Sequence, residues 1–238
     1  MPSGRSCEGD VVLPIYAGLV ASNLRLAYPL PDGNQLDVLD IPELRIPRGD
    51  TVGITGPSGS GKTSLLYVLA GLEHPQQGTV AWAGIDVVRL PEGARDKWRR
   101  RSVGFVFQDF HLFSGMSLVQ NVLVPTSFEQ FRPLISVRAR AESLLSRVGI
   151  ERKNVTPDRC SRGEMQRVAV ARALLFSPPV VMADEPTASL DPANGQAVSD
   201  LLIEMCRETE STLVVVTHDR VLLDRLSTVR TLIRGRLQ

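Results

Sequence analysis

Apolar and polar residues alternate along the first third of the chain. LVASNLRLAY, from Leu19 to Tyr28, and LDIPELRI, from Leu39 to Ile46, have the two-residue period of strands with one buried face. The connection YPLPDGNQ is rich in turn-forming residues, and GTVAWAGIDV predicts a hairpin further on. We therefore expect β structure in most of the N-terminal third.

The spacing then becomes helical. TVGIT predicts a strand, KTSLLYVLAGL has helical spacing after a glycine-rich loop, and SVGFVFQ, from Ser102 to Gln108, predicts a second buried strand. From Phe110 to about Arg159 the pattern is mostly helical, with RARAESLLSRVGI as its clearest amphipathic piece. This stretch predicts a helical subdomain inserted at about residues 109–178.

Helices alternate with apolar strands in the last part of the chain. GEMQRVAVARALLFS predicts a helix that Pro178 and Pro179 stop, and DPANGQAVSDLLIEMCRET predicts a helix opened by Asp191 with Pro192 in its first turn. VVMAD and STLVVVTHD are apolar almost throughout, as in strands buried on both faces. Together these patterns predict an α/β fold: a mostly parallel sheet covered by helices, with an N-terminal antiparallel β subdomain and the inserted helical subdomain.

Length and composition fit one domain with an insertion. The chain has 238 residues, 43% hydrophobic and 22% charged, which is enough to bury a full core. We expect residues 1–18 to be an N-terminal extension and residues 19–238 to form the domain. A formal net charge of +1 gives no general attraction to nucleic acid, and no nucleic-acid partner is expected. The basic cluster at residues 95–101 is interpreted as a solvated helix and turn.

The cysteines and the longest apolar run favour a cytoplasmic chain. Cys7, Cys160 and Cys206 have no metal-ligand spacing and are too few for a disulfide framework, which favours a reducing compartment. VVLPIYAGLVA, from Val11 to Ala21, is too short to span a bilayer and contains Pro14. Any membrane-spanning part is therefore expected on another polypeptide.

The clearest chemical motif is the glycine-rich loop GPSGSGKT. It matches G-x-x-x-x-G-K-[ST] and lies between a predicted strand and a predicted helix. Backbone N–H groups and the helix N-terminus can surround phosphates there, with Lys62 on the β and γ phosphates and the Thr63 hydroxyl on Mg²⁺. The predicted nucleotide-binding residues of this loop are Gly56, Pro57, Ser58, Gly59, Ser60, Gly61, Lys62, Thr63 and Ser64.

Polar residues follow three further apolar strands. VVMADEP places Asp184 at the carboxyl end of a buried strand, where an aspartate can hold Mg²⁺. Glu185 would bring a second carboxylate beside the γ phosphate, the position of a general base that activates water. His218, after TLVVVT, and Gln108, after VGFVF, are from position alone more often structural than functional residues.

The order of these motifs resembles that of the nucleotide-binding subunits of ABC transporters, from about Leu19 to Arg236. The matching elements are the P-loop GPSGSGKT, the glutamine loop FVFQ, the signature CSRGE followed by MQRVAVARAL, then VVMADEPT, SLD and VTHD. The resemblance implies an ATPase that uses ATP and Mg²⁺. GFVFQ, NVLVP and ADEPT look most like the subgroup of macrolide exporters, lipoprotein release and the cell-division membrane complex, and polar amino-acid importers carry closely similar motifs.

The resemblance also implies roles for single residues. Gln108 would sense Mg²⁺ and the attacking water, and His218 would contact the γ phosphate while holding Glu185 and the water in line. Tyr28 resembles the aromatic residue that stacks on adenine. The predicted catalytic residues are then Glu185, His218, Gln108 and Lys62, and the predicted metal ligands are Thr63, Gln108 and Asp184.

The signature is implied to act on a second subunit. In this family two subunits dimerise head to tail, and each ATP lies between the P-loop of one and the signature of the other. Ser161, Gly163 and the N-terminus of the following helix would contact the γ phosphate of the partner's ATP. Glu164 and Asp191, from CSRGE and SLD, complete the predicted nucleotide-binding set.

Three positions depart from the usual signature Leu-Ser-Gly-Gly-Gln. Arg162 and Glu164 leave Ser161 and Gly163 in place and are expected to be tolerated. Cys160 replaces a large apolar anchor by a small one, which is expected to loosen the loop. A redox role for Cys160 has little support, because most free cysteines are simply small hydrophobic residues.

The resemblance implies two partners: a second copy in an ATP-sandwich homodimer, and a separate transmembrane permease that would keep the chain at the inner face of the cell membrane. Phe110, Phe113 and Met116 suit a groove for a short helix of that permease or, equally, the core of the helical subdomain. The alternative function is a nucleotide-switched, membrane-associated regulator that transports no solute. A P-loop kinase is disfavoured, because CSRGE and SLD have no place in one.

Overall fold

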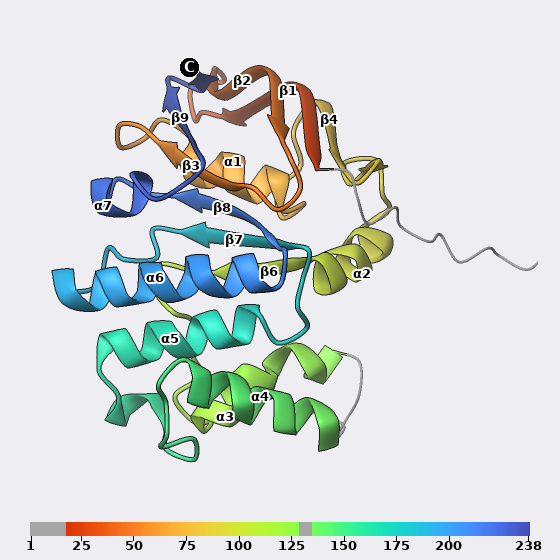
Figure 1. Ribbon diagram of the computed structural model, residues 1–238. Helices are drawn as coiled ribbons and strands as arrows, with labels where there is room; N and C mark the ends of the chain where they lie inside the picture. The colour runs from red at the N-terminus through yellow and green to blue at the C-terminus, as the bar shows by residue number, and fades with distance from the viewer. Residues whose placement is uncertain (1–17, 129–134) are drawn as a thin grey trace, which may run out of the picture.

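The computed structural model describes residues 18–128 and 135–238, which form two sheets with helices between and around them (Figure 1). The first sheet is antiparallel, with strand order β2-β1-β4-β5. Its strands are β1 (Leu19–Pro29), β2 (Gln35–Ile46), β4 (Gln77–Trp82) and β5 (Ile85–Asp86). This sheet is the predicted N-terminal β subdomain. The predicted extension lies outside the described residues, apart from Gly18.

The second sheet is mostly parallel, as predicted, with strand order β10-β9-β3-β8-β7-β6. Its strands are β3 (Thr51–Thr55), β6 (Val103–Val106), β7 (Val180–Asp184), β8 (Thr212–Val216), β9 (Thr228–Ile233) and β10 (Arg236–Leu237). In the described part of the chain, β9 and β10 are its one antiparallel pair. Because parallel strands end at the same edge, the loops after β3, β7 and β8 lie together.

Helices lie on both faces of the parallel sheet (Figure 1). α1 (Lys62–Leu69) lies between the two sheets, whereas α5 (Arg162–Ala173) and α6 (Pro192–Glu208) lie on the opposite face. The remaining helices are α2 (Glu92–Ser102), α3 (Leu118–Leu123), α4 (Ile135–Arg147) and α7 (Arg220–Leu223), with 3₁₀ turns at Val124–Phe128 and Pro157–Arg159. None of the helices in residues 18–128 and 135–238 has the length and apolar character needed to cross a membrane.

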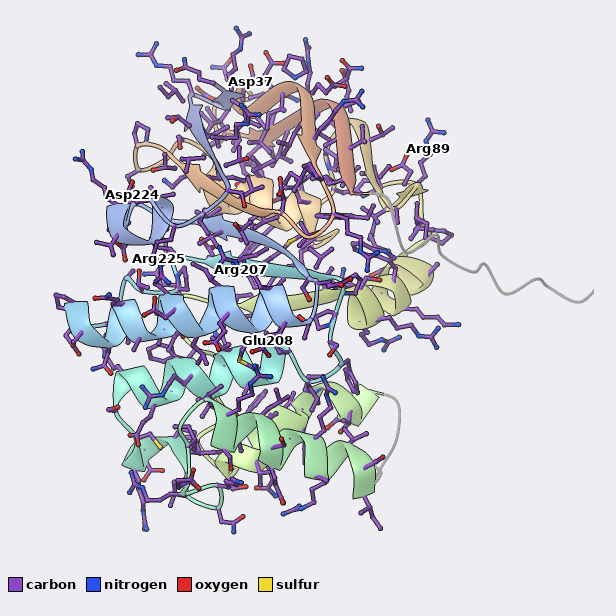
Figure 2. The ribbon with its side chains drawn as sticks, viewed as in Figure 1. Asp37, Arg89, Arg207, Glu208, Asp224 and Arg225 are labelled. Carbon is purple, nitrogen blue, oxygen red and sulfur yellow. The ribbon has the colours of Figure 1, made fainter. Side chains whose placement is uncertain are left out.

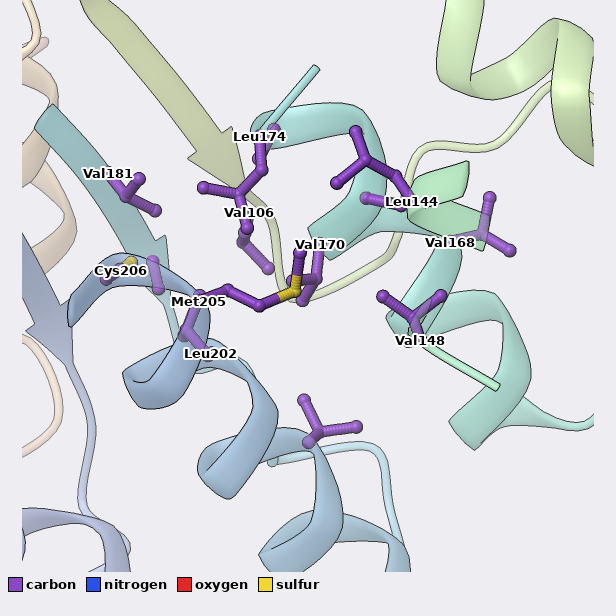
Figure 3. Packing of buried hydrophobic residues seen from close by; sticks show 14 of the residues in the cluster. Val106, Leu144, Val148, Val168, Val170, Leu174, Val181, Leu202, Met205 and Cys206 are labelled. Carbon is purple, nitrogen blue, oxygen red and sulfur yellow. The ribbon is translucent and has the colours of Figure 1, made fainter. Parts of the chain in front are cut away.

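The parallel sheet separates two apolar cores, and β7 contributes to both. Val180 and Met182 pack in the core with α1 and the antiparallel sheet, whereas Val181 and Ala183 pack in the core with α5 and α6. Successive side chains of a strand point to opposite faces, so a strand covered on both faces is apolar at every position. Figure 3 shows the second core, with Val181 from β7 and Met205 from α6 among its members.

The segment expected to be mostly helical begins with an irregular stretch at residues 107–117. The fully buried side chain of Asn121 stabilises it, because its amide oxygen accepts from the N–H of Phe113 at 2.7 Å. The amide nitrogen donates to the carbonyl oxygens of Phe113, Met116 and Ser117, each at 3.1 Å. A capping box between Ser117 and Gln120 then starts α3. The boundaries of the helical subdomain, at about 109–178, stay a prediction.

Ion pairs link α6 to neighbouring elements, and Figure 2 labels one member of each pair, Glu208 and Arg225. Arg147 of α4 pairs with Glu208, and Arg225, just after α7, pairs with Asp200. All four side chains are at least partly exposed, so each pair contributes only about 0–1 kcal/mol. The apolar cores, rather than these pairs, therefore hold α6 in place.

Candidate active site

The carboxyl edge of the parallel sheet brings the predicted phosphate-binding and acidic residues together. Ile54 of β3 and Asp184 of β7 both pair with Val216 of β8, so the three strands end at one level. The glycine-rich loop follows β3, Glu185 follows β7, and His218 lies two residues beyond β8. Segments far apart in the sequence thus meet at one site.

Two glycines allow the loop after β3 to fold as it does. Gly56 has φ 148° and Gly61 has φ 95°, conformations that favour glycine. A Cβ on Gly56 would lie 2.1 Å from the carbonyl oxygen of Leu232, and one on Gly61 would lie 2.7 Å from that of Val38. Any side chain at either position would therefore displace the loop from the strands behind it.

Lys62 lies over the loop, and its positive charge lowers the pKa of the nearby Asp184 carboxyl. Its Nζ donates to the carbonyl oxygens of Gly56 and Pro57, each at 3.0 Å. Carbonyl groups hold an ammonium group without neutralising it, and phosphate oxygens would form stronger, charge-assisted hydrogen bonds. Ser60 Oγ is buried and has no hydrogen-bond partner in the described residues, so its hydroxyl is available to donate to a phosphate oxygen.

Thr63 and Asp184 form the pair predicted to hold Mg²⁺. Thr63 Oγ1 donates to Asp184 Oδ1 at 3.3 Å. Burial raises the pKa of the Asp184 carboxyl. The hydrogen bond from Thr63 lowers this pKa, and the negative charge of the neighbouring Glu185 raises it. A divalent cation would stabilise the ionised carboxylate, and hydroxyl and carboxylate oxygens are ligands that Mg²⁺ accepts. The two residues therefore fit the ion.

Glu185 is held by its backbone and by both carboxylate oxygens. Its φ of 45° is uncommon for a residue other than glycine, and its N–H donates to the carbonyl oxygen of Val216 at 2.8 Å. Thr217 Oγ1 donates to Glu185 Oε2 at 3.3 Å, and His218 Nδ1 lies 2.9 Å from Glu185 Oε1. A carboxylate in its ionised form only accepts hydrogen bonds, so Nδ1 of His218 is the donor whenever Glu185 is ionised. The imidazole is 73% exposed, which leaves its other nitrogen open to a substrate.

Gln108 and Tyr28 lie beside this site. Gln108 is two residues beyond β6, at the same edge of the sheet, with an exposed side chain. The Tyr28 hydroxyl donates to Glu73 and contacts Ser64, so the phenol lies against α1. Burial and the Glu73 carboxylate raise the pKa of Tyr28. The predicted roles of Gln108 in sensing Mg²⁺ and of Tyr28 in stacking on adenine stay predictions.

The signature lies apart from the glycine-rich loop of the same chain. Ser161 Oγ accepts from the N–H of Glu164 at 3.2 Å, and the Glu164 carboxylate accepts from the N–H of Ser161 at 2.8 Å. The latter hydrogen bond lowers the pKa of Glu164, and Arg152 lies 3.5 Å from its carboxylate. In the described ranges, no hydrogen bond or ion pair joins residues 160–164 to residues 56–64.

The comparison with protein families decides the identity of this fold. A family model described as ABC transporter matches residues 39–188, which include the glycine-rich loop, the signature and the Asp184-Glu185 pair. The chain belongs to the ABC transporter family. The predicted fold class and the predicted ATPase activity are thereby confirmed.

Several ABC proteins are similar over most of their length. The lipoprotein-releasing system ATP-binding protein LolD of Syntrophus aciditrophicus (strain SB) is 40% identical over 206 residues, covering 86% of this chain and 92% of that protein. LolD of Alcanivorax borkumensis is 41% identical, covering 85% and 88%. A solved dimeric structure, a post-hydrolysis state of the ATP-binding cassette MJ0796 bound to ADP and Pi, has 33% identity and a TM-score of 0.84, covering 92% of this chain and 96% of that one.

The ABC motifs did not reveal Arg172, which joins the signature helix to the glutamine loop. Its Nη1 and Nη2 donate to the carbonyl oxygens of His111 and Phe110, both at 2.6 Å. Phe110 and His111 have φ of 58° and 47°, so the guanidinium stabilises an uncommon backbone just after Gln108. An arginine inside the apolar run VAVARALL was the available signal, because a buried charge needs fixed polar partners.

Asp191 of this ABC chain acts as a helix cap. Its carboxylate accepts from the N–H of Asn194 at 3.1 Å and from the Asn194 side chain at 2.6 Å. These hydrogen bonds lower the pKa of Asp191. Its predicted contact with nucleotide stays a prediction. Asn194 and Thr217 also shape the site, and neither is predicted from the sequence motifs.

Proposed function

We propose that this ABC ATPase works as a head-to-tail homodimer that drives a separate membrane subunit. The observation that carries the proposal is a divided site: Lys62, Asp184 and Glu185 come together within one chain, while no hydrogen bond in the described residues joins Ser161 to them. A second copy that places its Ser161 over the glycine-rich loop would complete the site. The dimeric state described for the MJ0796 cassette supports this arrangement.

Within each site, the residues of one chain would bind ATP and activate water. Lys62 would leave the loop carbonyls and bind the β and γ phosphates. Thr63 and Asp184 would hold Mg²⁺, which neutralises phosphate charge when bound. Glu185 would accept the proton of the attacking water, and the hydrogen bond from His218 would fix its carboxylate in line.

The signature would supply the opposite wall of the partner's site. The first N–H groups of α5 and the positive end of its dipole favour an anion at Ser161. Glu164 would otherwise repel a phosphate, but its carboxylate is turned towards the Ser161 N–H and towards Arg152. The exposed Arg162 adds a positive charge where the usual signature has glycine. These departures are therefore compatible with phosphate binding.

A groove beside the glutamine loop suits a helix of the membrane subunit. The cavity has a volume of about 360 Å³, and its lining includes Phe105, Phe107, Phe113, Phe176, Arg99, Arg100 and Arg172. Phe113 and Phe176 are 52% and 42% exposed, and a short amphipathic helix would cover such rings. Of the three residues named from sequence, Phe113 lines this groove and Met116 is exposed.

The relatives support a role in lipoprotein release. Both LolD proteins named above are parts of lipoprotein-releasing systems and align over more than four fifths of this chain. The chain would then act at the inner face of the membrane, held there by the membrane subunit. The 2.9 Å contact between His218 and Glu185 favours a hydrolysing motor over a regulator that only binds nucleotide.

The test is the mass of Glu185→Gln in solution with and without MgATP, followed by recovery of membrane proteins on the trapped form. The variant keeps the phosphate-binding residues but loses the base, so we expect an ATP-dependent doubling of mass and a co-purifying multi-span protein. A variant that hydrolyses ATP at the parental rate would contradict the role of Glu185. A monomer in both conditions, with and without the membrane protein, would contradict the dimer.

A further inference from the structure

The side chain of Gln166 joins the signature helix to the segment that carries Glu185. Gln166 is fully buried in α5, and its Nε2 donates to the carbonyl oxygen of Pro186 at 2.8 Å. Its Oε1 is buried and has no hydrogen-bond partner in the described parts of the chain. The donation to Pro186, the residue after Glu185, is therefore the one hydrogen bond that this amide forms within the described residues.

The backbone around Glu185 depends on such contacts. Its left-handed conformation persists only where neighbouring groups hold it. The Glu185 N–H is held by Val216, and the Glu185 carbonyl accepts from the N–H of Ala188 at 3.2 Å. Pro186 has no N–H, so its buried carbonyl is its one backbone group for hydrogen bonding, and Gln166 supplies the donor.

Gln166 and Ser161 are on the same rigid element. Ser161 caps α5, and Gln166 lies five residues further along the chain, about a turn and a half of helix. A displacement of the α5 N-terminus is thus carried to Gln166 without any change inside the helix. Pro186 receives that displacement through a hydrogen bond of normal length.

We propose that Gln166 is a positioning residue that couples the two ATP sites of the dimer. ATP bound by the partner pulls on Ser161, α5 moves, and the hydrogen bond from Gln166 to Pro186 sets the carboxylate of Glu185 for the chain's own ATP. The inference rests on the proposed function, since it requires a signature that contacts the partner's nucleotide. Gln166 acts through Pro186 and does not itself contact ATP.

Two variants separate the donated hydrogen bond from the packing of this side chain. Gln166→Met keeps the length and apolar volume but has no donor. Gln166→Glu keeps the shape and donates only when its carboxyl is protonated, and burial raises the pKa of such a carboxyl. Steady-state ATP hydrolysis is measured for both, with the parental chain, from pH 5.5 to 8.5.

The two variants have different expected profiles. Gln166→Met should lose about 10-fold or more in kcat at every pH, because a misplaced base is costly, while KM for ATP stays within about two-fold of the parental value. Gln166→Glu should approach the parental kcat at acidic pH and fall towards Gln166→Met as the pH rises. Each rate is divided by the folded fraction at that pH, because ionisation of a buried carboxyl also destabilises the fold as the pH rises. A role in folding alone would then add no pH dependence to kcat.

Ser211→Ala is the matched control. Ser211 is also buried and also donates to a proline carbonyl, that of Pro178 at 2.6 Å, but at the opposite end of the strands. Loss of the Ser211 hydroxyl should lower Tm, as the Gln166 substitutions do, but should leave kcat unchanged. If Gln166→Met does not fold, the pH profile of Gln166→Glu alone carries the test.

Two results would overturn the inference. One is a folded Gln166→Met with parental kcat, and the other is a Gln166→Glu profile parallel to that of the parental chain. Both leave the proposed function intact, because the parental chain still hydrolyses ATP. A parental chain that dimerises on MgATP but hydrolyses none at any pH would instead contradict the proposed function.

Discussion

A Cβ atom on Gly163 would lie 2.6 Å from Oδ1 of Asn194, so the signature helix and α6 are in close contact where both begin. Asn194 cannot move aside freely, because its N–H and its side-chain amide both donate to Asp191. The signature and the SLD segment therefore form one surface, and the size of residue 163 sets the distance between them.

Gly163→Ala should force these helices apart. We expect a loss of about 1–3 kcal/mol in the free energy of unfolding, as for other overpacked contacts, and weaker ATP-dependent dimerisation. Urea denaturation and light scattering in the Glu185→Gln background measure the two effects. Adding Asn194→Ala removes the crowding amide and should restore part of the dimerisation. A single variant as stable as the parent would show that the contact relaxes easily.

Asp184→Asn should stabilise the chain without ligand. Burial raises the pKa of Asp184 in the folded chain above the ordinary value of 3.8. The folded chain therefore binds this proton more tightly than the unfolded chain, and the resulting contribution to the free energy of unfolding is lost as the pH rises from 3.8 through the raised pKa. Asparagine does not titrate, so the variant keeps its stability as the pH rises. We expect the free energy of unfolding of Asp184→Asn at pH 7 to exceed that of the parental chain by roughly 0.5–2 kcal/mol. The gain should shrink towards pH 4, and stabilisation by MgATP should be lost. Denaturation at both pH values, with and without MgATP, tests this.

Phe113→Asp should release the membrane subunit while leaving the ATP site intact. The substitution places a charge on the exposed ring position of the aromatic groove, where a docked helix would bury it. Co-purification from detergent-solubilised membranes should be lost, with ATP hydrolysis by the isolated chain unchanged. Ile135→Asp, at a 90% exposed position outside the groove, is the control. Equal recovery with both variants would argue against this groove.

The sheet edge could be predicted from the sequence, because it follows from local patterns. VVMAD and TLVVV are apolar at every position, which requires a strand covered on both faces, and parallel strands end together. The meeting of Thr63 with Asp184 follows from these two rules and the glycine-rich loop between strand and helix. No knowledge of tertiary contacts was needed for that part of the site.

The irregular glutamine loop could not be predicted in this way. Asn121 has the spacing of an ordinary helical residue. Its side chain nevertheless forms the hydrogen bonds to the backbone of Phe113 and Ser117 that regular secondary structure would otherwise supply. Gln166 and Arg172 likewise lie in a regular helix, and their partners are 20 and about 60 residues away in sequence. Periodicity identifies the helix but carries no information on which distant carbonyl a side chain meets.

The side chains of β7 alternate between the two cores, and this alternation determines the position of Asp184 as well as the packing. A one-residue shift in the register of this strand would exchange the faces of Val180 and Val181, bring each into the wrong core, and turn Asp184 away from Thr63. Both cores would have to be rebuilt before the carboxylate could occupy another position. The location of Asp184, the carboxylate predicted to hold Mg²⁺, is thus set by apolar side chains that take no part in the chemistry, so the register of this strand, and not only the identity of residue 184, determines where the carboxylate lies.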